Sequence, residues 1–279
     1  MWQCPLCQAP IALTSSVIKC SNNHSFDKAK AGYVNLLPVQ FKKSKSPGDD
    51  KNMVRARRDF HLQQGYAPLK QKMVALLAQH GHANAQPFVV YDAGCGEGSY
   101  LNACVEGLNK QGFNTLGAGS DIAKIAVELA AKAFKNEQFV VASSFDLPLQ
   151  DESIDAAIQV FAPGSSEQYH RVLKADGLLM TVDPAPQHLI ELKALIYDKP
   201  EFHKVSGVTR NGFSRISDET LSFTLPLTSE AQRIALIKMT PYYWSLPAQK
   251  LTHIVQQLNQ VTASFSIQLF RKQRSESDD

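Results

Sequence analysis

The sequence predicts an α/β fold, in which helices flank a mostly parallel β-sheet, with a small metal-binding domain in front of it. Three observations support this prediction. Metal-binding side chains gather in the first 24 residues, a buried strand leads directly into a glycine-rich loop, and strand and helix patterns alternate after that loop. The 279 residues, of which 44% are hydrophobic, can form a substantial core, and no apolar run reaches the length of a membrane span.

Cysteine and histidine spacing supports the N-terminal domain. Cys4, Cys7, Cys20 and His24 follow the pattern C-x2-C-x12-C-x3-H, which is typical of zinc ligands on two knuckles. Three cysteines cannot form two disulfide bonds, and a redox CxxC motif would need a βαβ context that this segment lacks. Four protein ligands leave no open coordination position, so we expect a structural zinc ion that stabilises a domain of residues 1–37, with a short strand pair in residues 10–19.

Positive charge is concentrated at the same end of the chain. Residues 1–58 carry ten Lys or Arg against three Asp, a net charge of +7, whereas the remainder carries −4. Residues 38–52 are basic, polar and turn-rich, which predicts a linker to a second domain of residues 53–279. Charge alone leaves two interpretations open, a polyanionic partner for the N-terminal part and a solvated basic linker.

A strand, a glycine loop and a helix follow two helices that are predicted in residues 53–81 with a break near 65–68. Residues 88–91 are apolar and predict a buried strand, and residues 99–108 and 114–119 predict the next helix and strand. Between the first strand and its helix the pattern is D-x-G-x-G-x-G, formed with Asp92, Gly94, Gly96, Glu97 and Gly98.

The loop has the chemistry of a cofactor site. Glycines let a ligand approach the backbone closely, and the following helix points its amide dipoles at that ligand. Asp121 stands 23 residues after Gly98, where an acid can accept hydrogen bonds from ribose hydroxyls. A dinucleotide would need the third glycine at Ser99, and Asp92 and Glu97 would repel its pyrophosphate. Both acids suit a ligand that carries an ammonium and a sulfonium group.

This D-x-G-x-G-x-G loop resembles motif one of the class I S-adenosylmethionine-dependent methyltransferases. The resemblance implies a Rossmann-like, seven-stranded, mostly parallel sheet and S-adenosylmethionine as cofactor. Residues 138–142, 151–158 and 170–180 resemble the next strands of the same fold and the helix between them. Ser143 stands where relatives usually have an acid that binds the adenine amino group, so backbone groups or Asp146 would take over that role.

Further motifs concern the methyl acceptor. Together with the zinc ligands they resemble those of the bacterial 23S ribosomal RNA guanine-N1 methyltransferases, over all but the acidic tail 275–279: Y-V-N-L-L-P-V-Q at 33–40, P-G-D at 47–49, A-R-R at 56–58, H-L-I-E-L-K at 188–193 and M-T-P at 239–241. The resemblance implies methyl transfer to N1 of a guanine in a hairpin loop of 23S rRNA, which the zinc domain and the basic segment would grip. It also implies that Tyr66 and His188 lie against the cofactor.

Several points stay open at this stage. Asp183 and His188 are the nearest candidates for the group that accepts the N1 proton, and neither is assigned. Candidate stacking groups for the base are Phe161, Tyr242, Tyr243 and Trp244. The alternatives to the expected function are a methyltransferase of a small molecule or a protein, and a non-catalytic RNA-binding protein that retains the cofactor pocket.

Location and assembly are the remaining expectations. The N-terminal residues lack the charged and apolar regions of a signal peptide, so we expect a cytoplasmic protein without membrane association. We also consider a homodimer, in which two basic modules would hold one RNA.

Overall fold

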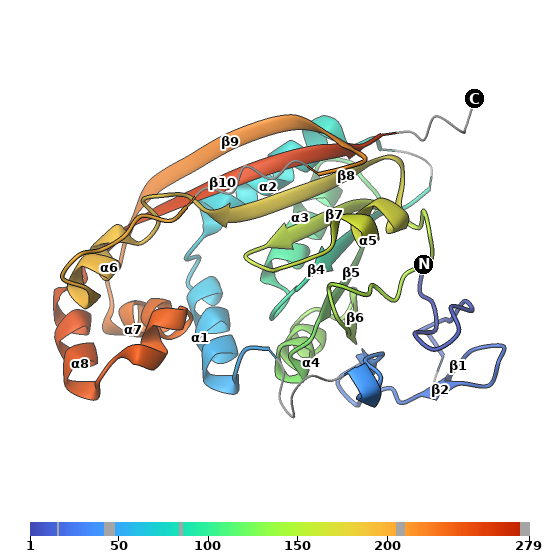
Figure 1. Ribbon diagram of the computed structural model, residues 1–279, viewed down its shortest axis with the longest axis horizontal. Helices are drawn as coiled ribbons and strands as arrows, with labels where there is room; N and C mark the ends of the chain where they lie inside the picture. Colours follow the sequence, from blue (N-terminus) through green and yellow to red (C-terminus); the bar gives the residue numbers. More distant parts are fainter. Residues whose placement is uncertain (16, 42–47, 84–85, 205–209, 274–279) are drawn as a thin grey trace.

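The computed structural model describes residues 1–15, 17–41, 48–83, 86–204 and 210–273, so part of the expected basic linker and the acidic tail lie outside the described residues. One large sheet forms its centre (Figure 1). The strands of this sheet are β3 (Val34–Asn35), β4 (Phe88–Ala93), β5 (Thr115–Asp121), β6 (Gln138–Val141), β7 (Ile154–Val160), β8 (Leu173–Pro184), β9 (Phe213–Pro226) and β10 (Gln260–Lys272).

The strand order is β3-β6-β5-β4-β7-β8-β10-β9. Strands β3 to β8 pair in parallel, and β10 pairs antiparallel with both β8 and β9. The predicted seven-stranded, mostly parallel sheet is therefore confirmed as β4 to β10, and β3 adds an eighth strand at the edge. The strand order reverses between the neighbours β4 and β7, because β5 and β6 follow on one side of β4 and β7 and β8 follow on the other. Ligands of open α/β sheets bind at such a reversal.

Side chains of the central strands alternate between two cores. In β4, Phe88 and Val90 belong to one buried cluster, whereas Tyr91 and Ala93 belong to the other. Burial on both faces explains why this run is almost entirely apolar. The helices are α1 (Lys51–Leu62), α2 (Ala67–His80), α3 (Ser99–Lys110), α4 (Lys124–Ala133), α5 (Ser166–Val172), α6 (Ile190–Ile196), α7 (Glu230–Lys238) and α8 (Ala248–Gln257), with short 3₁₀ helices η1 (Val39–Phe41) and η2 (Pro241–Ser245).

The two helices predicted in residues 53–81 are confirmed as α1 and α2. Asp50 caps α1, because its side chain accepts hydrogen bonds from the N–H groups of Asn52 and Met53. The buried Val54 packs against Ala123 and residues of α4, which fixes α1 beside the loop that follows β5.

The strand pair expected in residues 10–19 is wrong in its placement. Strand β1 (Ile18–Lys19) pairs antiparallel with β2 (Ser25–Phe26), so the two strands flank the turn that carries Cys20 and His24. Strands of two residues are too short for side-chain periodicity to locate them.

The N-terminal segment shares one buried cluster with the sheet. The indole N–H of Trp2 donates to Gln138 Oε1 at 2.6 Å, and its ring meets the Tyr91 ring edge-on at 6.0 Å between centroids. Trp2 also forms a β-bridge with Leu149. The segment therefore covers residues between β6 and β7, in which the structure has no helix.

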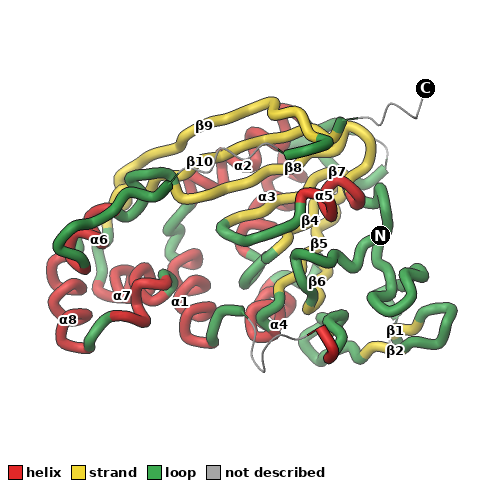
Figure 2. The backbone as a smooth tube through the Cα atoms, in the orientation of Figure 1, coloured by secondary structure: helices red, strands yellow, loops and turns green. Residues whose placement is uncertain are grey.

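Figure 2 shows helices α6, α7 and α8 gathered beyond one end of the antiparallel strand pair β9–β10, and α7 and α8 belong to the connection between these two strands. Helix α7 contacts α1 and α8, so this group of helices is continuous with the one that precedes β4. None of the described helices combines the length and the hydropathy that crossing a membrane requires.

Candidate functional site

The glycine loop has the backbone that its sequence requires. Gly94, Gly96 and Gly98 have φ values of +85°, +54° and +88°, in the region that side chains disfavour. A Cβ on Gly94 would also lie 2.5 Å from the Cβ of Ala162, which follows β7. The loop therefore depends on glycine both for its turn and for its close approach to the segment that follows β7.

Three carboxyl groups crowd around this loop. Asp121, at the end of β5, accepts the N–H groups of Gly96 at 2.9 Å and Ala123 at 2.7 Å. The Ser99 hydroxyl donates to Glu97 at 2.8 Å. Asp92 is 1% exposed, and its Oδ1 has no hydrogen-bond partner among the described residues.

Burial disfavours the charged forms of these three carboxyl groups. Burial raises the pKa of Asp92 well above its usual value, and the neighbouring Asp121 and Glu97 raise it further. Burial also raises the pKa of Glu97 and of Asp121. A cation bound between these groups would relieve their repulsion and favour their charged forms. The loop is thus suited to a positively charged ligand.

Two basic side chains from α1 and α2 complete the surroundings of the loop. Arg57 pairs with Asp49 at 2.6 Å, and its Nη1 would lie 3.5 Å from a Cβ on Gly96. Lys70 Nζ lies 5.8 Å from the centre of the Tyr100 ring, and burial lowers its pKa while Glu97 raises it. Sequence reasoning did not select Lys70, although its position four residues after Tyr66 places both on one face of α2.

Tyr66 and His188 meet in the buried space beside these groups. The Tyr66 hydroxyl lies 3.4 Å from His188 Nε2, and His188 Nδ1 accepts the N–H of Ser264 at 3.2 Å. Because Nδ1 is an acceptor, the ring proton resides on Nε2, which donates to Tyr66. Burial lowers the pKa of His188 to about 3, with a contribution from His203. His188 is therefore a neutral hydrogen-bond donor.

Ser143 lies directly after β6, at the same edge of the sheet. Its hydroxyl accepts the N–H of Phe145 at 3.2 Å, and the adjacent Ala142 N–H donates to the carbonyl of Asp121 at 3.2 Å. The structure thus brings the end of β6 beside the end of β5. The expected cofactor residues gather at the carboxyl ends of β4, β5 and β6 and at the start of α2, with His188 after β8.

The candidate acceptor and stacking groups do not all gather there. Side chains on β8 alternate between the two faces of the sheet, so Asp183 shares the face of Leu179 and lies opposite Val182. Burial raises the pKa of Asp183, and Arg210 lowers it. Phe161 follows β7 and contacts the His188 ring, with 6.3 Å between centroids. Tyr242, Tyr243 and Trp244 lie on η2, near α7.

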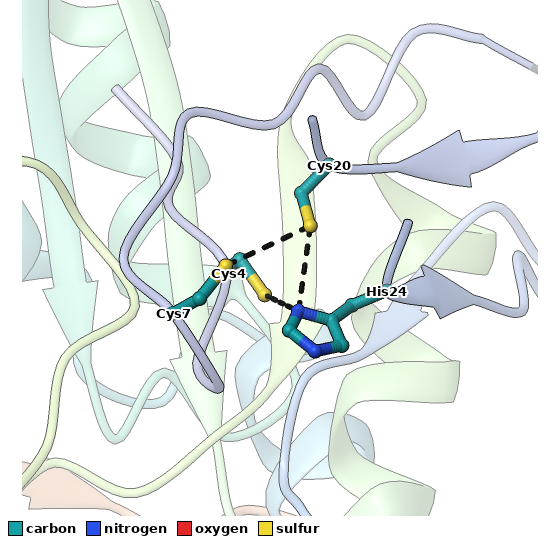
Figure 3. A group of neighbouring side chains, drawn as sticks. All are labelled: Cys4, Cys7, Cys20 and His24. Carbon is teal, nitrogen blue, oxygen red and sulfur yellow. Dashed lines mark hydrogen bonds between the residues drawn. The ribbon is translucent and has the colours of Figure 1, made fainter. Parts of the chain in front are cut away.

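Figure 3 shows the second site, in which Cys4, Cys7, Cys20 and His24 face one another. Cys7 Sγ lies 3.7 Å from Cys20 Sγ, and His24 Nδ1 lies 3.5 Å from both Cys4 Sγ and Cys20 Sγ. A zinc ion with bonds of about 2.3 Å to sulfur and about 2.1 Å to nitrogen would set tetrahedral edges of about 3.6–3.8 Å.

The four ligand atoms all lie within 4.8 Å of one another, so the set fits one zinc ion. A hydrogen bond from the Ala9 N–H is the main cause that lowers the pKa of the Cys7 thiol to about 6, which favours the thiolate that zinc binds.

Comparisons with known proteins agree with both sites. A family model described as "RlmA, N-terminal" matches residues 2–45, and one described as a methyltransferase domain matches residues 87–242. The chain is 32% identical to YxjB of Bacillus subtilis (strain 168), which is named as a candidate 23S rRNA (guanine-N1)-methyltransferase, over 90% of both chains. It is 31% identical to the 23S rRNA (guanine(748)-N(1))-methyltransferase of Streptomyces fradiae, over 96% of both chains. The chain therefore belongs to the family of 23S rRNA (guanine-N1)-methyltransferases, with an N-terminal zinc ribbon and a class I methyltransferase domain.

Proposed function

We propose that this chain transfers a methyl group from S-adenosylmethionine to N1 of a guanine in a hairpin loop of 23S rRNA. The observation that carries the proposal is the crowding of Asp92, Glu97 and Asp121 around the glycine loop, in a chain whose zinc segment packs on the same sheet. The relatives named above support N1 of guanine as the acceptor.

The loop residues have distinct roles in holding the cofactor. Gly94, Gly96 and Gly98 would leave room for it against the backbone, and Asp121 would accept hydrogen bonds from its ribose hydroxyls in place of one of the present N–H donors. Asp92 and Glu97 would face its positive charges.

The flanking residues hold the two ends of the cofactor. Tyr66 and His188, which contact each other, would hold its methionine end, and Ser143, after β6, would lie beside its adenine. Bound S-adenosylmethionine supplies an electrophilic methyl group on a sulfonium.

The protein then has to position the guanine and accept its N1 proton. His188 is unsuited to the second task, because Nδ1 already accepts the Ser264 N–H and Nε2 carries the ring proton. Asp183, the other expected acceptor, shares the face of β8 with Leu179 and lies opposite Val182, on the side of the sheet away from His188 and Phe161, so the proton acceptor stays unassigned. Much of the rate comes from the orientation of the base against the methyl group.

The zinc segment and the basic residues after it would bind the RNA phosphates. Such a reaction on ribosomal RNA would take place in the cytoplasm, and a homodimer would let two such segments hold one RNA. Binding through phosphates should weaken steeply as salt is raised, which a small-molecule methyltransferase would not show.

The test is the transfer of tritiated methyl groups from S-adenosylmethionine to 23S rRNA that lacks the modification, followed by digestion to nucleosides. We expect label in 1-methylguanosine at one position. Label in another nucleoside would refute N1 of guanine as the acceptor. Binding of both cofactor and RNA without any label would instead support a non-catalytic RNA-binding protein.

A further inference from the structure

Aromatic rings surround the space beside the glycine loop. The ring of Phe161, at the end of β7, lies 5.8 Å from Phe265, 6.3 Å from Tyr100 and 6.3 Å from His188, measured between centroids. Tyr66 joins the group through Phe265 at 4.9 Å. These five residues are called the aromatic cluster below.

Phe161 differs from the other members in its exposure. It is 41% exposed, whereas Tyr66 is 2%, Tyr100 7%, His188 7% and Phe265 0% exposed. Phe161 therefore packs on buried rings and still presents part of its side chain to an incoming group. A partly exposed ring that is positioned by buried rings offers a surface for stacking.

The backbone of Phe161 is strained. Its φ is +53°, in the left-handed region that bulky residues rarely adopt. The strain is maintained by the surrounding structure, because the Phe161 N–H donates to the Val182 carbonyl at 2.9 Å. The next residue is held as well, since Gln159 Nε2 donates to the Ala162 carbonyl at 2.5 Å.

Strain of this kind is concentrated near the aromatic cluster. Among the described residues other than glycine with a positive φ, Phe161 and Leu189 are the apolar ones. Leu189 directly follows His188 of the cluster. The others are polar, and two of them, Asn23 and Asp176, are of the residue types that tolerate this conformation more readily: Gln8, Asn23, Gln64, Glu152 and Asp176. Backbone strain on apolar residues is typical of positions that a binding site requires.

We propose that Phe161 is the platform on which the target guanine stacks. The inference rests on the proposed function and adds the residue that orients the base. Ala162 lies against Gly94, close enough that a Cβ there would clash, so a base on Phe161 lies next to the loop that holds the cofactor. Bases that leave a hairpin loop are held mainly by aromatic stacking, which is tolerant of sequence and depends on the ring.

The first experiment compares Phe161→Leu with Phe161→Tyr. Leucine meets the same backbone strain but lacks the ring, so we expect kcat/KM for the RNA to fall roughly 5- to 150-fold, the equivalent of about 1–3 kcal/mol of stacking. Phe161→Tyr keeps the ring and should retain kcat/KM within about threefold. The dissociation constant of S-adenosylmethionine and the melting temperature should be unchanged in both variants.

Trp244→Leu tests the alternative stacking group on η2, an exposed aromatic residue outside the aromatic cluster, and should retain kcat/KM within about threefold; a fall as large as that of Phe161→Leu would overturn the proposal. The proposal is overturned if the wild type forms 1-methylguanosine and Phe161→Leu does so with the same kcat/KM. It is also overturned if Phe161→Leu weakens cofactor binding to the same extent as it lowers kcat/KM, which would give the ring a structural role. Absence of 1-methylguanosine with the wild type would refute the proposed function instead.

A second measurement locates the base directly. RNA with 6-thioguanosine at the methylated position is irradiated on the full-length protein, and the cross-linked peptide is identified by mass spectrometry. We expect a cross-link at Phe161 or Ala162. A cross-link on η2 would overturn the proposal.

Discussion

The Tyr66 hydroxyl and His188 Nε2 lie 3.4 Å apart in the buried space beside the glycine loop, although 122 residues separate them in the sequence. The contact joins the start of α2 to the segment after β8. Because His188 Nδ1 accepts a hydrogen bond from the Ser264 N–H, the imidazole is neutral. Its one N–H proton is on Nε2 and points at the Tyr66 hydroxyl.

His188→Asn tests this protonation state. The folded protein keeps His188 neutral with a pKa of about 3, whereas the unfolded chain takes up a proton near pH 6.5. His188 therefore causes a loss of stability as the pH falls below 6.5, and that loss is absent above it. Asparagine cannot take up this proton. Between pH 5.5 and 4, the free energy of unfolding of the wild type should fall by about 1.4 kcal/mol per pH unit more than that of the variant. Parallel urea-denaturation curves in this range would contradict the assignment.

Gly94→Ala tests the close contact of the loop. A Cβ at this position would lie 2.5 Å from the Ala162 Cβ, and we expect the affinity for S-adenosylmethionine to fall at least about tenfold, measured by calorimetry. Gly112→Ala is the matched control, since its φ of +89° gives similar strain but nothing lies within 4 Å of the added Cβ. Gly112→Ala should lose about 1–2 kcal/mol of stability through backbone strain, and Gly94→Ala should lose more, because the clash with Ala162 adds to similar strain. Equal cofactor affinity in the two variants would contradict the prediction.

Asp92→Asn tests the crowding of the acids. The pKa of Asp92 is raised in the folded protein, so its contribution to stability is present at low pH and is lost as the pH rises through that raised pKa. The uncharged side chain avoids this loss. We expect the cofactor-free variant to melt at a higher temperature than the wild type at pH 8, with the difference shrinking toward pH 4, and to bind S-adenosylmethionine at least about tenfold more weakly.

Asp198→Asn removes the same charge from an exposed position and should change neither property. A less stable Asp92→Asn variant at pH 8 with normal cofactor affinity would rule out the crowding.

Cys7→Ser tests the zinc site. The variant should lose its zinc, measured by plasma emission spectroscopy, and with it RNA methylation, because the N-terminal segment depends on the ion. Of the two tryptophans, Trp2 is 3% exposed and Trp244 57%, so a red shift of the fluorescence on zinc loss would report Trp2. The cofactor affinity should stay within about threefold of the wild type. Ser25→Ala, in the same segment on β2, should keep both zinc and activity. Full methylation by a zinc-free protein would contradict the prediction.

The zinc ligands and the glycine loop could be predicted from the sequence because each depends on residue types at short, fixed spacings. Cys4, Cys7, Cys20 and His24 converge as their spacing indicates. The patterns of buried strands and of a helix predicted β4, α3 and β5, and the resemblance to the methyltransferase fold predicted β6, β7 and β8. Helix α4 was not predicted.

The contacts between distant segments were not predictable. Two-residue strands such as β3 leave no pattern, so its pairing with β6 could not be foreseen. The same holds for Lys70 beside Glu97, which depends on how α2 packs. The positive φ of Phe161 is imposed by its neighbours in the fold, and the residue type at this position does not predict it.

The packing of the N-terminal segment on the sheet has a consequence for biosynthesis. The zinc ligands are complete by residue 24, but the partner of Trp2, Gln138, is made 136 residues after it. A nascent chain therefore exposes Trp2 and Ile18 long before their packing surface leaves the ribosome. During that interval a zinc ion on the four ligands would be the main constraint on the segment, so we expect folding of the nascent chain to depend on zinc binding early in synthesis.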